Sequence, residues 1–258
     1  MAGPTTAERQ QTDSGPLRAI RLRRPPGPRV LVVALLCLAL VGAGCTWLLY
    51  GSQWLRVERV PVSGARVLTA GQVLEAADVP VGSPMVSVDT DAIEARLRQE
   101  LPRIDSVEAV RSWPDAIGLK VTERTPVLIE RKNGKFVEVD AKGVRYATVS
   151  RAPKGVPVLE VSASPSASLR RFGTERLVRE AVRVAGSLPP AVARDTRVVK
   201  VRSYDSISLE LGGRRTVEWG SGERARAKAR TLTALMKAAP GARYFDVSVP
   251  TAPASSGS

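Results

Sequence analysis

The sequence predicts an α+β protein that is anchored by one N-terminal transmembrane helix. Three observations lead to this fold class. Residues 30–50 form an uncharged apolar run. Residues 55–124 read as strand, helix, helix, strand and strand, and residues 125–249 read as a β-rich region with two helices. A chain of 258 residues has room for two small domains beside such a helix.

Composition excludes several classes of protein. The chain has no histidine and only two cysteines, Cys37 and Cys45, which both lie in the apolar run. Catalysis through histidine, Cys/His zinc sites and a disulfide-stapled domain are therefore excluded. The net charge of +14 favours an anionic partner, but its meaning depends on where the charge lies.

The apolar run at 30–50 is long enough to cross a bilayer as a helix, since 21 residues span about 31 Å. Five arginines precede it closely and only two follow at similar distance, namely Arg18, Arg21, Arg23, Arg24 and Arg29 against Arg56 and Arg59. This bias predicts a cytoplasmic N-terminus and a single-pass, type II protein of the cell membrane. Most of the basic surface then lies outside the cytoplasm, which argues against nucleic acid as a partner.

Two processing alternatives are less favoured. A cleaved signal peptide has a shorter apolar region than this one. Cys45 follows small residues as in a lipoprotein signal, but Gly42 stands where a leucine is usually required. The leader at 1–29 is rich in Pro, Gly and Arg, and we expect a disordered basic segment that is attracted to membrane lipid.

Residues 55–124 predict a small α+β unit. Arg56–Ser63 reads as a strand, and Thr69 with Gln72 fits a capping box at the start of a helix. Asp89 is the predicted cap of a second helix, whose apolar stripe comprises Ile93, Leu97 and Leu101. Two further strands follow at 107–111 and 117–121, separated by the turn Ser112-Trp113-Pro114-Asp115.

Residues 125–249 predict a β-rich domain. Asn133-Gly134 between apolar runs is a strong hairpin signal, because both positions need positive φ. Residues 161–171 read as a polar loop, and Pro250–Ser258 reads as a disordered tail. The remaining expected elements are helices at 175–185 and 223–238 and strands at 198–201, 207–211, 216–219 and 244–249.

The last predicted strand is the main candidate for partner binding. Its apolar residues Phe245, Val247 and Val249 alternate with Tyr244, Asp246 and Ser248, so one face should be buried. An unpaired edge strand offers backbone N–H and C=O groups to an incoming strand. A plain core strand is the alternative interpretation, and one strand can serve both roles.

Several segments resemble the FtsQ/DivIB family of bacterial cell-division proteins. LPRIDSVEAVRSWPDAIGLKVTERTPVLI, FVEVDAKGVRY and YFDVSVP are similar to family motifs in the same order, over about residues 54–250. One departure is Arg103, where the family often has tryptophan. The matching positions of the first motif are Leu101, Pro102, Ile104, Val107, Val110, Arg111, Trp113, Pro114, Val121, Glu123, Arg124, Pro126 and Val127.

The resemblance implies a POTRA domain at 55–124, an FtsQ-type β-domain at 125–249 and a place at the division septum. It implies that Tyr244, Phe245, Asp246, Val247, Ser248 and Val249 receive the coiled-coil septal proteins FtsB/DivIC and FtsL. The septal transpeptidase and its flippase are implied as direct or indirect partners. Arg111, Trp113 and Pro114 are a possible POTRA contact, with a packed turn tryptophan as the alternative for Trp113.

Catalysis is not predicted. The sequence has no phosphate-cradling glycine motif and no EF-hand spacing, and no carboxylate pair stands out. We therefore expect no enzyme, cofactor, metal or small-molecule substrate, and we expect a scaffold of the division machinery. The alternative is a membrane-anchored POTRA module of a secretion or envelope-assembly pathway.

Overall fold

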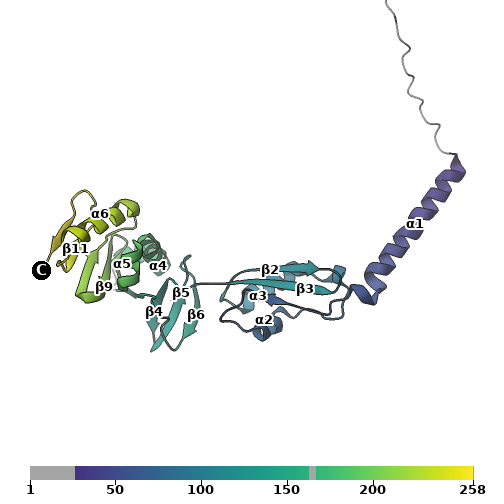
Figure 1. Cartoon of the computed structure of the whole chain (residues 1–258), viewed down its shortest axis with the longest axis horizontal. Helices are drawn as coiled ribbons and strands as arrows, with labels where there is room; N and C mark the ends of the chain where they lie inside the picture. Colours follow the sequence, from purple (N-terminus) through teal and green to yellow (C-terminus); the bar gives the residue numbers. More distant parts are fainter. Residues whose placement is uncertain (1–26, 163–166, 258) are drawn as a thin grey trace, which may run out of the picture. The chain divides into compact units, whose positions relative to one another are not determined.

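The computed structural model describes residues 27–162 and 167–257, and the predicted disorder of the leader therefore lies almost wholly outside the described residues. The chain divides into two units, Met1–Ser52 and Gln53–Ser258. The first unit contains helix α1, and the second contains two sheets of three and nine strands with their helices. Figure 1 labels these elements along the chain.

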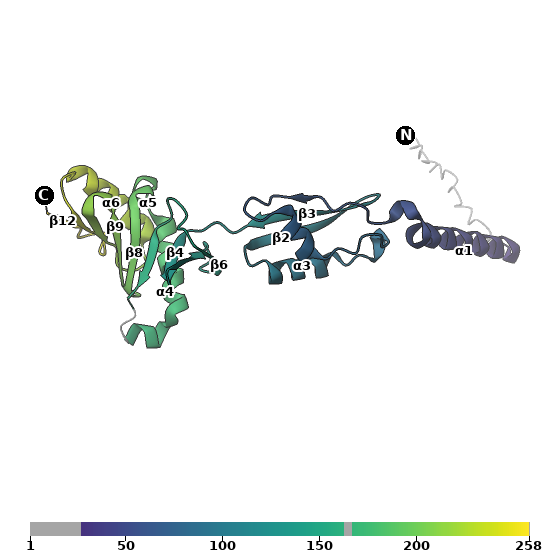
Figure 2. The same ribbon diagram turned by 90° about the horizontal axis from the view of Figure 1, so that it is seen from below.

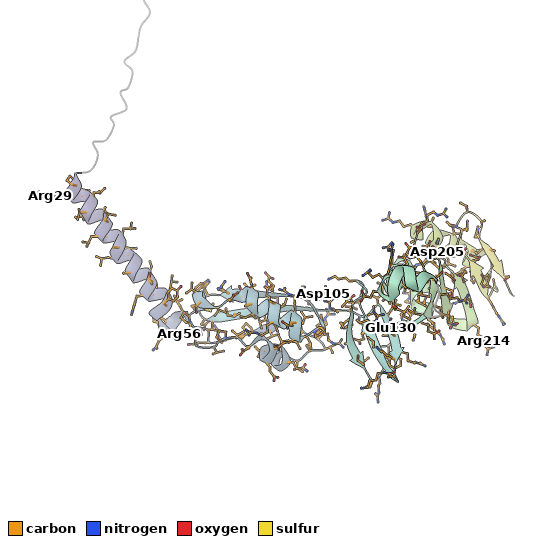
Figure 3. All side chains as sticks on the ribbon, turned by 180° about the vertical axis from the view of Figure 1, so that it is seen from behind. Arg29, Arg56, Asp105, Glu130, Asp205 and Arg214 are labelled. Carbon is orange, nitrogen blue, oxygen red and sulfur yellow. The ribbon has the colours of Figure 1, made fainter. Side chains whose placement is uncertain are left out.

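Helix α1 spans Pro28–Gly51 and confirms the predicted apolar helix. Pro28 stands in the first turn, where its missing N–H costs no hydrogen bond, and Arg29 follows it at the start of the helix (Figure 3). No residue of α1 is buried in protein. Within the described residues it is the one helix long and apolar enough to cross a membrane.

The first folded part of the second unit has the predicted element order. Short strand β1 (Val62–Ser63) pairs in parallel with β3 (Ala116–Glu123), and β3 pairs antiparallel with β2 (Ile104–Ser112). Two α-helices connect β1 to β2, namely α2 (Ala70–Ala77) and α3 (Thr90–Glu100). Short 3₁₀ turns η1 (Gln53–Leu55) and η2 (Met85–Ser87) precede β1 and α3.

The predicted helix caps are confirmed. Thr69 and Gln72 form a complete capping box at α2, and Asp89 accepts a hydrogen bond from the Ala92 N–H at α3. Ile93 and Leu97 are buried. The strand predicted at Arg56–Ser63 is shorter than expected, since β1 comprises only Val62–Ser63, and Arg59 forms an isolated bridge with Ala116 before it.

The second sheet has the strand order β12-β11-β10-β9-β8-β7-β4-β5-β6. Its first strands are β4 (Leu128–Lys132), β5 (Lys135–Val139), β6 (Arg145–Val149) and β7 (Val158–Val161). The later strands are β8 (Thr196–Ser203), β9 (Ser206–Leu211), β10 (Arg215–Glu218), β11 (Tyr244–Asp246) and β12 (Ala254–Ser256). Asn133 and Gly134 both have positive φ between β4 and β5, as the hairpin prediction requires.

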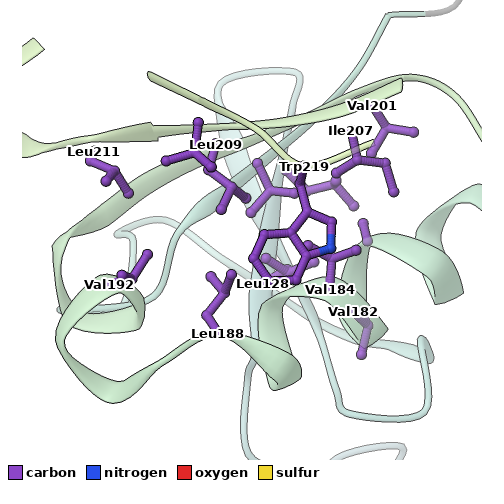
Figure 4. Close-up of a cluster of buried hydrophobic side chains, with 14 of the residues drawn as sticks. Leu128, Val182, Val184, Leu188, Val192, Val201, Ile207, Leu209, Leu211 and Trp219 are labelled. Carbon is purple, nitrogen blue, oxygen red and sulfur yellow. The ribbon is translucent and has the colours of Figure 1, made fainter. Parts of the chain in front are cut away.

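Three helices complete this domain, namely α4 (Ala167–Ser187), α5 (Pro190–Asp195) and α6 (Ala225–Ala238). Their apolar residues pack with alternate residues of β8 to β11 in one core. Trp219 lies fully buried in this core between the sheet and the helices (Figure 4). The aromatic side chain therefore ties the end of β10 to the helical layer.

Several expectations for this domain are wrong. The segment 161–171 is not one polar loop, because Val161 belongs to β7 and α4 begins at Ala167. Strand β7 and helix α5 were not predicted. The tail from Pro250 is not wholly disordered, since Ala254–Ser256 forms β12 (Figure 2). By contrast, Gly212-Gly213, whose sequence indicates a hairpin turn, does join antiparallel strands β9 and β10, through the 3₁₀ segment η3 (Gly212–Arg214).

Candidate functional site

The candidate site is strand β11 of the nine-stranded sheet, on the side that faces away from β10. This strand pairs in parallel with β10, with Val217 opposite Phe245 and Glu218 opposite Asp246. Phe245 and the following Val247 are both buried, as the alternation predicted. The apolar face of β11 is thus packed into the core.

The strand ends earlier than predicted. Asp246 Oδ1 accepts hydrogen bonds from the Ser248 N–H at 2.9 Å and from the Ser248 hydroxyl at 2.7 Å. A carboxylate that bonds to the backbone two residues on forms a turn. Residues Val247 to Val249 are therefore outside the strand, and Val249 is 47% exposed, which corrects its predicted place on the buried face.

Two hydrogen bonds between β11 and β10 determine which backbone groups of β11 point outward. Arg243 C=O accepts from the Thr216 N–H at 2.7 Å, and the Val247 N–H donates to Glu218 C=O at 3.0 Å. In a trans peptide the C=O and the next N–H point in opposite directions. The Tyr244 N–H and the Asp246 C=O consequently point away from β10, toward the outer edge.

This edge is covered by the chain itself, which corrects the expectation of an open edge. Strand β12 runs antiparallel to β11, with Ser256 opposite Tyr244 and Ala254 opposite Asp246. The Arg243 N–H also donates to the Gly257 carbonyl at 2.7 Å. All three residues of β12 are exposed, so this pairing buries no side chain of β12.

The face of the sheet beside this edge is acidic. Glu218 and Asp246 are paired neighbours, and Tyr244 lies two residues from Asp246. Burial raises the pKa of Glu218, the Arg202 guanidinium opposes this effect, and Asp246 adds to it. Burial likewise raises the pKa of Tyr244, and the Asp246 and Glu218 carboxylates add to that shift. A cation placed here would meet two carboxylates.

A buried polar cluster that sequence reasoning missed supports the segment beside β11. Lys228 of α6 is buried, and its Nζ donates to the Trp219 and Ser221 carbonyls at 2.8 Å each. Burial lowers the pKa of Lys228, with Arg224 acting in the same direction. The signal was present in the sequence, because Lys228 lies three residues after Ala225 and four before Leu232, on the apolar face of the helix.

This cluster fixes the loop between β10 and α6. The Glu180 carboxylate accepts the Gly222 N–H at 2.8 Å. At Gly220, which has positive φ, an added Cβ would lie 3.0 Å from the Ser248 Cβ. The loop therefore packs closely against the residue that ends the turn after β11.

The predicted POTRA residues belong to the other sheet and are not brought together with β11. Arg111 donates from its guanidinium to the Met85 and Val88 carbonyls, so it ties β2 to the η2 segment. Trp113 is 53% exposed in the turn between β2 and β3, which corrects the packed-tryptophan interpretation. Contact of Trp113 and Pro114 with a partner stays a prediction.

Metal chemistry gains no support from the described part of the chain. No cluster of three or more His, Cys, Asp or Glu side chains within residues 27–162 and 167–257 has the geometry to hold a metal ion. What this edge offers chemically is backbone hydrogen bonding beside an acidic face.

Known proteins with similar sequences decide the family. Residues 55–124 match the family described as POTRA domain, FtsQ-type. The chain is 70% identical to the cell division protein FtsQ of Streptomyces collinus and 68% identical to that of Streptomyces coelicolor, each over 100% of both chains. The chain belongs to the FtsQ family of cell division proteins.

The likeness extends beyond Streptomyces. FtsQ of Mycobacteroides abscessus is 33% identical over 87% of this chain and 68% of its own length. A solved extracytoplasmic domain of DivIB from Geobacillus stearothermophilus is 16% identical, with a TM-score of 0.32, over 50% of this chain and 97% of that one. The family has a role in the assembly that divides the cell, and the chain combines that role with an α+β fold and one apolar N-terminal helix.

Proposed function

We propose that this chain is a non-catalytic membrane scaffold that captures an extended segment of a partner protein at the outer edge of β11. The observation that carries the proposal is the edge itself. Phe245 and Val247 hold the strand in the core, while the Tyr244 N–H and Asp246 C=O point outward. Such groups bind a partner strand through main-chain hydrogen bonds.

The proposed partners are the coiled-coil septal proteins FtsB/DivIC and FtsL, with the septal transpeptidase and its flippase joined directly or through them. The proposed topology places the N-terminus in the cytoplasm and both folded domains outside, at the septum. The arginines before α1 support this orientation, because positive charge is retained on the cytoplasmic side. The scaffold would thus connect division proteins to septal peptidoglycan synthesis by contact alone.

A proline at the edge tests this proposal. Tyr244→Pro removes the outward N–H and leaves the bonds to β10 intact, because the Tyr244 N–H faces β12 and not β10. Tyr244→Ala removes the same side chain but keeps the donor, and it serves as the matched control. We expect capture of purified FtsB/DivIC by the detergent-solubilised full chain to weaken about tenfold or more in Tyr244→Pro relative to Tyr244→Ala.

Folding of both variants is checked by thermal unfolding. If folded Tyr244→Pro captures the partner as well as Tyr244→Ala does, strand addition at β11 is wrong. A proline at Ser248 would not test the edge, because the Ser248 N–H is already bonded to Asp246.

A further inference from the structure

Strand β12 pairs with β11 through its backbone and buries no side chain. Its three residues, Ala254, Ser255 and Ser256, are small and exposed. Cross-strand side-chain contacts and burial stabilise sheets, and such small exposed side chains supply little of either. Strand β11, by contrast, buries Phe245. The last two strands on this side of the sheet, β11 and β12, are therefore held with very different strength.

The segment that joins β11 to β12 is held in place by hydrogen bonds up to about residue 252. The Ala252 N–H donates to the Val249 carbonyl at 3.0 Å, and the Thr231 hydroxyl of α6 donates to the Pro250 carbonyl at 3.4 Å. These bonds hold the chain up to about residue 252. Release of β12 therefore frees only the few residues after this turn and leaves the core unchanged.

In this register β12 adds no positive charge beside Glu218 and Asp246. The Arg202 guanidinium acts on Glu218, and Ser248 donates two hydrogen bonds to Asp246. Ala254 is opposite Asp246, whose other neighbour in the sheet is Glu218. An alanine supplies no charge to these carboxylates. A strand with lysine or arginine in the place of Ala254 would gain a cross-strand ion pair that the tail lacks.

We propose that β12 is a built-in placeholder strand, which covers the outer edge of β11 until an extended partner segment with a basic residue at the Ala254 position displaces it. The inference rests on the proposed capture of a strand at β11 and adds its regulation and the chemistry of the segment. The tail shields the hydrogen-bonding edge from unspecific pairing. It also lowers the apparent affinity of every competing strand, which equals the intrinsic affinity multiplied by the fraction of time for which the edge is uncovered.

Hydrogen exchange of the full chain in detergent tests the cover without any partner. Truncation after Ala252 should speed exchange of the Tyr244 amide about tenfold or more, with little change at Phe245 and Val247. In the intact chain, Ala254→Lys should slow exchange at Tyr244, and Ala254→Glu should speed it. Equal exchange of the Tyr244 amide in the intact and truncated chains would contradict the proposal that β12 covers this edge.

A peptide tests displacement. The probe is a labelled peptide with the sequence of residues 250–257 carrying Ala254→Lys and Ser256→Val, measured by fluorescence anisotropy. We expect it to bind the truncated chain at least tenfold more tightly than the intact chain, and more tightly than the same peptide with glutamate in place of the lysine. Equal binding to both chains, binding to neither, or no preference for lysine over glutamate each contradicts the proposal.

The two proposals fail separately. If Tyr244→Pro captures the coiled-coil partner normally, the proposed function is wrong at this edge, whatever the exchange data show. Suppose instead that capture depends on the Tyr244 N–H but that truncation changes neither hydrogen exchange nor peptide binding. Strand capture at β11 is then supported, and the proposed placeholder role of β12 is wrong.

Discussion

Single carboxylates and ammonium groups fix the loops of both folded parts of the second unit. Glu123 at the end of β3 accepts the backbone N–H groups of Arg66, Val67 and Leu68 at 2.7 to 3.1 Å. Burial raises the pKa of this carboxyl, but the three N–H donors outweigh it, so the pKa lies below its usual range. The ionised Glu123 thus holds the segment before α2 against the sheet.

We expect Glu123→Gln to lower the free energy of unfolding by about 1–3 kcal/mol, because hydrogen bonds to a charged group are lost or weakened. Thermal unfolding measures this change. The matched control is Glu108→Gln in β2, whose partner Lys120 is 3.4 Å away on an exposed surface. The control should change stability by less than about 0.5 kcal/mol, and an equal loss in both variants would contradict the role of Glu123.

The lowered pKa of the Glu123 carboxyl predicts that the free energy of unfolding depends on pH. Because its pKa in the folded state is lowered, its contribution is fully present above the unfolded pKa of about 4.3 and is lost as pH falls through the folded pKa. Unfolding scans from pH 7 to pH 3 should therefore show a steeper loss of stability in the native chain than in Glu123→Gln. Parallel curves for the two proteins would contradict this assignment.

Lys228 carries a second prediction at this scale. Lys228→Met keeps the length of the side chain but leaves the Trp219 and Ser221 carbonyls without their donor. We expect a loss of about 1–3 kcal/mol in unfolding free energy. Lys237→Met, on the exposed surface of the same helix, is the control and should change little. Equal stability of the two variants would show that the buried ammonium does not support the loop.

At the scale of elements, local signals in the sequence predicted the parts that local chemistry determines. The capping box at Thr69 and the Asn133-Gly134 hairpin were recovered because cap and turn geometry depend on a few adjacent residues. Helices α3 and α6 were recovered because their apolar residues repeat with helical spacing. These elements bury one face and need no distant partner to be recognised.

Elements that depend on distant pairing escaped prediction. Strand β7 is stabilised by parallel pairing with β4 and β8, which no local pattern records. Strand β12 has the residues of a polar tail and becomes a strand only because β11 offers its outer edge. The buried face of the candidate site could be read from the sequence at Phe245 and Val247, but the end of the strand at Asp246 depends on a side-chain turn.

At the scale of the whole molecule, charged residues, histidine and cysteine are distributed unevenly along the chain. The leader carries six arginines against two acidic residues, and the remaining basic excess lies after α1. The chain after Tyr50 contains neither histidine nor cysteine. The proposed topology and the proposed scaffold role require neither of these residue types.

The proposed topology gives a direct prediction. A protease added to intact protoplasts should remove an epitope fused after Ser258 and leave an epitope fused before Met1 protected. The arginines that precede α1 are the physical reason. Detergent lysis is the control, since both epitopes should then be cleaved, and protection of the C-terminal epitope in intact protoplasts would refute the orientation.

The central claim is that β11 captures a partner strand through its outer edge, and one measurement in cells tests it most directly. Cells depleted of the native chain are supplied with Tyr244→Ala or Tyr244→Pro, and septal recruitment of fluorescent FtsB/DivIC is imaged. We expect Tyr244→Ala to restore recruitment and septation and Tyr244→Pro to leave filaments without septa, at equal protein levels. Normal recruitment by Tyr244→Pro would contradict the account.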